Sequence, residues 1–237
     1  MSSPEEMHSG ELNITHRLVD ASNATLLGEI EGYGKVIYKP VAGERPLWDF
    51  PDGTLADREV ATYLLSEHLG FKLVPETILR EGPFGLGMVQ RWIEIDDGVD
   101  VIEFGQSEDS QLRDLALFDA MINNTDRKFG HLLIDQDGRL FGCDHGVTFH
   151  REDKLRTVLW QFSGAPLLDR ERALLRKALG DSGEISALLE KFLVDEEIEA
   201  FFARIARLLD ENCLPLPSEE WPAVPWPPVL EEFSPEG

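Results

Sequence analysis

The pattern of apolar and polar positions predicts a β-hairpin near the start of the chain. Residues 26–30 are mostly apolar, a glycine-flanked turn follows at 32–34, and residues 35–39 then alternate, with Val36 and Tyr38 on one side. Alternation with a period of two places successive side chains on opposite faces of a sheet. We therefore expect two antiparallel strands in this region.

A helix and two further strands are predicted after the hairpin. Apolar positions at helical spacing indicate a helix over residues 55–69, which Gly70 ends. Its apolar face consists of Ala56, Val60, Tyr63, Leu64 and Leu65. Two strands are expected next, over residues 76–80 and 84–95. The first 95 residues therefore predict a small sheet with one main helix.

Helices dominate the second half of the sequence. We expect a short hairpin with strands at 132–134 and 140–141, closed by an Asp-Gln-Asp-Gly turn. The expected helices cover residues 111–122, 167–179, 182–192 and 195–209. A β-rich first part and a helical second part predict a bilobal α+β fold, with ligands in the cleft between the lobes.

The same pattern gives domain boundaries. We place a β-rich lobe with one main helix at residues 1–91, a larger helical lobe at 92–214, and a proline-rich acidic tail at 215–237. Proline lacks a backbone N–H and clashes with the preceding helical turn, so the tail cannot continue a helix. Trp221 and Trp226 would be unfavourable in a free tail, so we expect both to lie on the larger lobe.

Composition and charge exclude several classes of partner. The chain has 237 residues and a formal charge of −23, from 45 acidic and 22 basic residues. Nucleic acids and anionic lipids attract proteins through Lys and Arg, so we expect no nucleic acid and no stable membrane association. No apolar run reaches the roughly 20 residues that span a bilayer. The first residues also lack the features of a secretion signal, so we expect a cytoplasmic protein.

The strongest candidate chemistry lies in residues 123–131, Asn-Asn-Thr-Asp-Arg-Lys-Phe-Gly-His, and 143–146, Cys-Asp-His-Gly. Asp126 precedes His131 by five residues and Asp144 by eighteen, which is the spacing of a kinase catalytic loop and metal-binding loop. Phosphoryl transfer needs one carboxylate to orient the attacking hydroxyl and another to hold metal ions on the phosphates. We assign Asp126 to the first role and Asp144 to the second, the alternative for each being a turn residue.

Lys39 and Glu59 fit the same chemistry. Lys39 closes the second predicted strand, and Glu59 lies on the helix that follows. In kinases, a strand lysine held by a helix glutamate directs its ammonium group at the nucleotide phosphates. A strand-end lysine by itself is more often a solvated residue. Together with the two downstream loops, Lys39 is assigned to phosphate binding.

His131 stands at a position where a loop asparagine would normally be the metal ligand. Mg²⁺ prefers oxygen ligands, whereas imidazole is a better ligand for Mn²⁺, Zn²⁺ or Fe²⁺. His131 is therefore either a metal ligand beside Asp144 or a hydrogen-bonding residue of the loop. We expect ATP with Mg²⁺ or Mn²⁺ as cofactors.

These residues resemble the phosphatidylinositol 3-/4-kinase-like superfamily, especially its small bacterial members related to phosphatidylinositol kinases. The lysine, the glutamate, a hinge strand and both loops occur in the family's order across about residues 20–150. The resemblance implies a bilobal kinase-like fold. It also implies that adenine lies against the hinge backbone around Gln90 to Trp92, and that Ser22 and Asn23 cover the phosphates.

Departures from that family bear on the substrate. No Gly-x-Gly-x-x-Gly loop precedes Lys39, which excludes the ordinary protein-kinase pattern but is expected of this superfamily. Only residues 147–166 separate Gly146 from the next predicted helix, which is short for a loop that recognises a lipid headgroup. Bacterial persistence-toxin and spore-coat kinases share the core and phosphorylate proteins. We therefore expect a protein hydroxyl or a soluble small molecule as acceptor.

Three functions are open on the sequence alone. The leading one is an ATP-dependent phosphotransferase acting on an alcohol group. The second is a nucleotide-binding pseudokinase that serves as a regulatory module, which His131 favours. The third is transfer of AMP in place of phosphate, which the same fold permits when the nucleotide binds in the reverse orientation.

Overall fold

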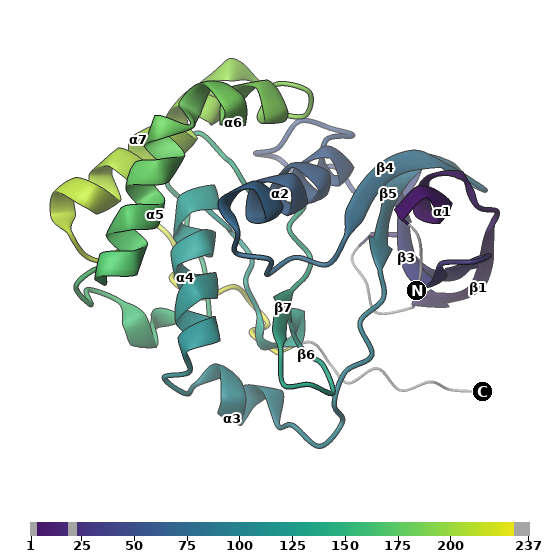
Figure 1. Cartoon of the computed structure of the whole chain (residues 1–237), viewed down its shortest axis with the longest axis horizontal. Helices are drawn as coiled ribbons and strands as arrows, with labels where there is room; N and C mark the ends of the chain where they lie inside the picture. The colour runs from purple at the N-terminus through teal and green to yellow at the C-terminus, as the bar shows by residue number, and fades with distance from the viewer. Residues whose placement is uncertain (1–3, 19–22, 230–237) are drawn as a thin grey trace.

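The structure, a computed structural model, describes residues 4–18 and 23–229 and confirms the predicted α+β class. Figure 1 shows a β-sheet on one side of the molecule and a larger group of helices on the other, with α2 (Leu55–Leu69) between them. The β-rich part comes first in the chain, as expected. The lobe boundaries at residues 91 and 214 stay a prediction.

Five antiparallel strands form the sheet, in the order β1-β2-β3-β5-β4. They are β1 (Leu12–Leu18), β2 (Thr25–Ile30), β3 (Gly34–Pro40), β4 (Thr77–Gly82) and β5 (Gly85–Arg91). The β2–β3 hairpin was predicted, whereas β1 was not. The strand expected over 84–95 stops at Arg91, because the chain then crosses to the helical part, where the N–H of Asp96 donates to Ile134 at 2.8 Å.

The two faces of the sheet have different surroundings. Val36 and Tyr38 face a small apolar core, to which the short helix α1 (Pro4–Ser9) contributes the fully buried side chain of Met7. Lys39 lies opposite Met88 on the neighbouring strand β5, and Met88 packs with apolar residues of α2. Strand alternation therefore turns the lysine toward α2.

Helix α2 covers the residues that the sequence predicted for it. The carboxylate of Glu44 accepts the backbone N–H of Leu55 at 3.2 Å and of Ala56 at 2.9 Å, so a charge from the preceding loop caps the helix. Negative charge stabilises a helix N-terminus. The helix ends at Gly70, whose φ of 81° is a left-handed conformation that glycine adopts without strain.

The helical part encloses the main apolar core, which contains the fully buried rings of Phe118, Phe149 and Phe201. Four predicted helices and the predicted hairpin are present within a few residues, and the short α3 was not predicted. The elements are α3 (Val101–Gly105), α4 (Ser110–Ile122), β6 (Leu132–Ile134), β7 (Leu140–Gly142), α5 (Asp169–Gly180), α6 (Ser182–Leu189), α7 (Asp195–Glu211) and the 3-10 turns η1 (Val41–Gly43), η2 (Phe129–His131) and η3 (Trp160–Phe162).

The described part of the tail hydrogen-bonds to the helical part. The carbonyl of Ala223 accepts the backbone N–H of Thr157 at 3.0 Å, and the carbonyl of Pro228 accepts that of Phe129 at 3.0 Å. Phe129 belongs to the predicted catalytic loop. The tail therefore braces this loop from outside.

The two tail tryptophans differ in their surroundings. The ring of Trp221 stacks on that of Trp48 at 6.4 Å between centroids. Trp226, in contrast, is 85% exposed, so the expectation that it is covered by the larger lobe is wrong.

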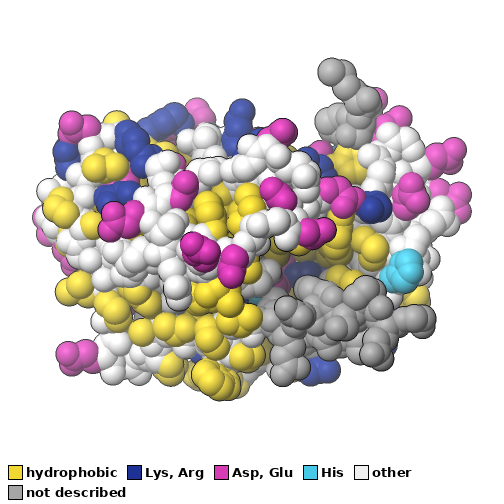
Figure 2. Space-filling model, turned by 90° about the horizontal axis from the view of Figure 1, so that it is seen from below, with side chains coloured by type: hydrophobic (Ala, Val, Ile, Leu, Met, Phe, Trp, Pro, Cys, Tyr) yellow, Lys and Arg dark blue, Asp and Glu magenta, His cyan; other side chains and the backbone are white. Residues whose placement is uncertain are grey.

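Figure 2 shows the underside of the molecule, where apolar side chains gather in one area with few charges among them.

Candidate active site

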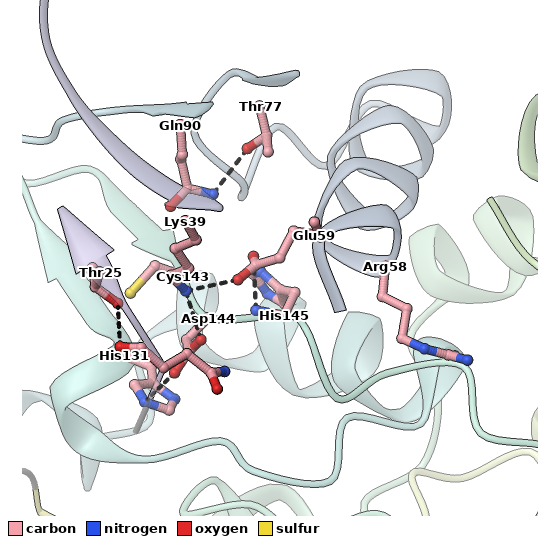
Figure 3. Close-up of polar contacts among 12 residues, drawn as sticks. Thr25, Lys39, Arg58, Glu59, Thr77, Gln90, His131, Cys143, Asp144 and His145 are labelled. Carbon is pink, nitrogen blue, oxygen red and sulfur yellow. Dashed lines mark hydrogen bonds and ion pairs between the residues drawn. The ribbon is translucent and has the colours of Figure 1, made fainter. Parts of the chain in front are cut away.

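Strand β3 and helix α2 bring Lys39 and Glu59 together. The ammonium nitrogen of Lys39 lies 2.9 Å from Oε1 of Glu59, whose side chain is only 2% exposed. The second oxygen, Oε2, accepts the backbone N–H of His145 at 2.9 Å. A buried carboxylate is tolerated when its oxygens have such partners. Glu59 therefore connects a strand, a helix and the loop after β7 (Figure 3).

Asp144 meets the same ammonium group, with Oδ1 2.8 Å from Nζ of Lys39. Its backbone has a φ of 60°, a left-handed conformation that a non-glycine residue adopts rarely. The charge of Lys39 holds the pKa of Asp144 well below its usual range. Burial alone would lower the pKa of Lys39, but the carboxylates of Asp144 and Glu59 outweigh it and raise that pKa. Lys39 and Asp144 are therefore both charged at neutral pH.

A fully buried ion pair that the sequence did not reveal fixes the loop of residues 123–131. Asp119 on α4 accepts hydrogen bonds from Nε of Arg127 at 2.8 Å and from its Nη2 at 2.9 Å. Both side chains are 0% exposed. Nη1 of Arg127 also donates to the carbonyl of Cys143 at 2.9 Å. This two-pronged contact is strong and directional, so it holds the loop beside Asp144.

Asp126 is presented by a local turn on this loop. Its backbone N–H donates to Oδ1 of Asn124 at 3.0 Å, and its side chain is 30% exposed. Burial raises the pKa of Asp126, and the nearby charge of Lys128, whose Nζ lies 3.0 Å from Oδ2, partly offsets that rise. A partly buried carboxylate with a raised pKa is suited to accept a proton from a hydroxyl.

His131 lies beside Asp144, with Nε2 3.3 Å from Oδ2. Burial lowers the pKa of His131 to about 4, so the ring is neutral at pH 7. A neutral ring carries one N–H, and an N–H on Nε2 toward the carboxylate leaves a lone pair on Nδ1. Among the described residues, Nδ1 has no hydrogen-bond partner. The neutral ring is the form that binds metal ions.

The donor atoms at this place fit a metal ion in part. Asp144 offers a carboxylate that is 48% exposed, and His131 offers a neutral imidazole, both of which suit Mn²⁺. Within residues 4–18 and 23–229, no group of three His, Cys, Asp or Glu side chains is placed to hold a metal ion. A metal here would take its other ligands from nucleotide phosphates and water, as divalent ions in such sites do.

The residues expected around adenine have backbone groups that are already paired. Gln90 lies in the middle of the sheet, opposite Ile37 of β3 and Thr77 of β4. The N–H of Trp92 donates to the carbonyl of Lys35 at 3.1 Å. Strand β5 ends at Arg91, so the chain leaves the sheet at Trp92.

The turn before β2 lies next to the loop that follows β3. Oδ1 of Asn23 accepts the backbone N–H of Arg45 at 2.8 Å, which ties the two segments together. Ser22, the other residue expected over the phosphates, lies outside the described residues.

Arg58 anchors α2 to the helical part, which the sequence analysis did not anticipate. It is 1% exposed and donates to the carbonyl of Thr148 at 2.7 Å and to Glu197 of α7 at 2.5 Å. Figure 3 shows its side chain pointing away from Lys39. Because Glu59 is the next residue, this anchor also sets the position of Glu59. The partners are 139 positions apart, so no local pattern could have linked them.

Several solved structures, two of them of kinases, have a similar fold. The Golgi casein kinase with Mn/ADP bound gives a TM-score of 0.60 at 14% identity, covering 87% of this chain and 74% of that one. Hydra Fam20 with sugar gives 0.57 at 14% identity, covering 87% and 86%. The Helicobacter pylori proinflammatory kinase CtkA gives 0.51 at 13% identity, covering 88% and 94%. These likenesses define an atypical kinase-like fold, and the resemblance to phosphatidylinositol 3-/4-kinases stays a prediction.

One curated relative places the chain in a family. Protein Rv2133c of Mycobacterium tuberculosis (strain ATCC 25618 / H37Rv) is 40% identical over an alignment that covers 92% of this chain and 92% of that protein. The chain belongs to the same family as that protein. No family model matches the sequence. In the described part of the chain, every helix is too short or too polar to cross a membrane.

Proposed function

We propose that this chain is an ATP-dependent phosphotransferase that acts on a hydroxyl group of a protein or of a soluble small molecule. The observation that carries the proposal is the position of Lys39, whose Nζ lies 2.9 Å from Glu59 and 2.8 Å from Asp144. Strand, helix and loop thus converge on one ammonium group, as they do where kinases bind the triphosphate. The kinase-like neighbours, one of them solved with Mn/ADP, support a phosphotransferase-type function.

The transfer step follows from the roles of three residues. Lys39 binds the phosphates, and Glu59 holds the ammonium group in place. Asp126 takes the proton of the acceptor hydroxyl while the hydroxyl oxygen forms a bond to the γ-phosphorus. The bond from that phosphorus to the β–γ bridging oxygen breaks, and ADP leaves with the electron pair.

Asp144 and His131 would hold Mg²⁺ or Mn²⁺. When bound, the metal neutralises charge on the β- and γ-phosphates. The carboxylate of Asp144 is ionised and the ring of His131 is neutral, as metal binding requires. Nε2 of His131 would bind the metal with its proton moved to Nδ1 and its contact with Oδ2 released. Because Lys39 already contacts Oδ1 of Asp144, the metal and the ammonium group would share this carboxylate.

The lobe division belongs to the same proposal. Residues 1–91 would bind the phosphates, residues 92–214 would supply both loops, and the described residues of the tail at 215–237 would brace the catalytic loop. The adenine base would lie near Gln90 and Trp92, where the chain leaves the sheet at the end of β5. Ser22 and Asn23 would lie over the phosphates.

A nucleotide-binding pseudokinase is the second candidate, and one contact favours it. Oδ2 of Asp144 lies 3.3 Å from the ring nitrogen of His131, while Oδ1 lies 2.8 Å from Lys39. Both carboxylate oxygens therefore have partners within the protein. A metal held by both Asp144 and His131 requires release of the contact between the ring and Oδ2, and a chain that keeps this contact would bind nucleotide without transferring phosphate.

Binding and transfer can be measured separately. We expect ATP with Mn²⁺ or Mg²⁺ to raise the melting temperature. With ATP that is labelled at the γ-phosphate, the label should then be transferred to the chain itself, to lysate proteins or to a compound in a metabolite extract. Asp126→Asn should keep the melting shift and lose transfer, whereas Asp137→Asn, in the exposed β6–β7 turn, should keep both. No shift with either metal would contradict ATP binding, a shift without transfer would support the pseudokinase, and transfer of α-label would show AMP transfer.

A further inference from the structure

Gln90 is a buried polar residue on the face of the sheet that carries Lys39. Lys39 pairs with Met88 across β3 and β5, and Gln90 lies two positions beyond Met88, so strand alternation turns all three side chains to the same face. Gln90 is 5% exposed and lies just before the chain leaves the sheet. Figure 3 shows its amide near Lys39 and bonded to Thr77.

A hydrogen-bond relay fixes which way this amide points. The hydroxyl of Thr77 donates to the carbonyl of Pro75 at 2.7 Å, and Thr77 is 1% exposed. A hydroxyl has a single proton, so Thr77 can only accept from Gln90. The group 2.8 Å from the hydroxyl must therefore be the NH₂ of Gln90, and the opposite orientation would place two acceptors against each other.

The relay leaves the amide oxygen of Gln90 as an unused acceptor. Among the described residues, Oε1 has no hydrogen-bond partner. It is also absent from the set of unpaired polar atoms that are completely buried, so a ligand can reach it. An acceptor that is fixed in direction and free of protein partners can distinguish a donor from another acceptor on a ligand.

We propose that Gln90 selects adenine over guanine nucleotides, because its Oε1 accepts a hydrogen bond from the exocyclic amino group of adenine. Guanine and hypoxanthine carry a carbonyl at that position, which would face the amide oxygen without a proton between them. The inference rests on the proposed function and adds to it the side chain that selects the base. Thr77 acts through Gln90 as a positioning residue.

Affinities for ATP, GTP and inosine triphosphate, measured with Mn²⁺ by calorimetry, test this proposal. We expect the unaltered chain to prefer ATP by at least about tenfold over both others, as polar groups that reject an unmatched partner do. Gln90→Met, of similar shape, should remove the preference. Thr77→Val should reduce it because the amide can then turn over, Thr77→Ser should retain it, and Thr15→Val, on the exposed strand β1, should leave it unchanged.

The outcomes separate this inference from the proposed function. Equal affinity for the three nucleotides in the unaltered chain would overturn the role of Gln90 and leave nucleotide binding intact. A full ATP preference in Gln90→Met would overturn it as well. If none of the three nucleotides binds, the proposed function itself fails. Circular dichroism of each variant shows that the fold is kept, and Gln90→Met provides the test if Thr77→Val does not fold.

Discussion

Oδ1 of Asp144 lies 2.8 Å from the ammonium nitrogen of Lys39, although the two residues are 105 positions apart in the chain. The contact joins β3 to the loop after β7 and leaves Lys39 between two carboxylates. Nucleotide phosphates and a metal ion would each enter this arrangement, the phosphates at the ammonium group and the metal at the carboxylate. The pair therefore predicts a linked loss of metal and nucleotide binding when either residue is changed.

Asp144→Ala should abolish the metal-dependent part of nucleotide stabilisation, because the metal loses its carboxylate. Thermal shift with ATP, with and without Mn²⁺, measures this. Asp137→Ala, in the exposed β6–β7 turn, is the matched control and should behave like the unaltered chain. An unchanged metal-dependent shift in Asp144→Ala would remove Asp144 from the metal site.

Lys39→Ala should weaken ATP binding by roughly 10- to 150-fold, since hydrogen bonds to charged groups contribute about 1.5 to 3 kcal/mol. The structure adds a second effect. Glu59 is 2% exposed and would keep only the N–H of His145, so the unfolding free energy should fall by about 1 to 3 kcal/mol.

Nucleotide titration and urea unfolding measure these two effects of Lys39→Ala. Lys177→Ala removes a lysine from an exposed ion pair on α5 and should change neither quantity by much. A loss of less than about twofold in ATP affinity would assign Lys39 to the structure alone.

The stability of the fold should decrease below pH 6.5, in part because of His131. Burial lowers the pKa of His131 to about 4; Asp144 opposes this, whereas Arg127, Lys128 and Lys39 reinforce it. Below pH 6.5 the unfolded chain gains a proton that the folded ring does not, so stability falls with decreasing pH until about pH 4.

Between pH 6.5 and about pH 4, the unfolding free energy of His131→Asn should fall less than that of the unaltered chain. The difference should be about 1.4 kcal/mol for each pH unit. Urea unfolding at pH 7, 6 and 5 tests this, with His16→Asn on the exposed strand β1 as control. The same variant also tests metal binding, because asparagine should shift the preference for nucleotide binding from Mn²⁺ toward Mg²⁺. An unchanged metal preference would leave His131 as a hydrogen-bonding residue.

Trp221→Ala should destabilise the fold. Nζ of Lys154 lies 4.7 Å from the ring centre of Trp48 and 4.6 Å from that of Trp221, and its side chain is 3% exposed. Cation–π contacts at desolvated sites contribute up to about 2 kcal/mol. We expect the melting temperature to fall by about 2 to 8 °C. Trp226→Ala removes a tryptophan that is 85% exposed and should leave the melting temperature unchanged. Equal effects of the two variants would contradict the role of Trp221.

Local patterns in the sequence were sufficient for much of the fold. The alternation over residues 35–39 and the helix at 55–69 depend on neighbours within a few positions, and α2 has the predicted bounds. Short elements escaped detection, because α1 and α3 contain too few residues to show a period. The spacing of the two loops indicated that His131 and Asp144 come together, because each lies beside an element that the sequence also predicts.

The sequence by itself determined the fold class and the pairing of Lys39 with Glu59. The tertiary structure alone decided how those residues are held. The buried pair of Asp119 and Arg127 and the relay from Gln90 to Thr77 involve polar residues with no distinguishing neighbours. Folding buried these groups together, and each then required a partner because an unpaired polar group away from water costs free energy. Such partners are chosen by three-dimensional proximity, which a linear pattern does not contain.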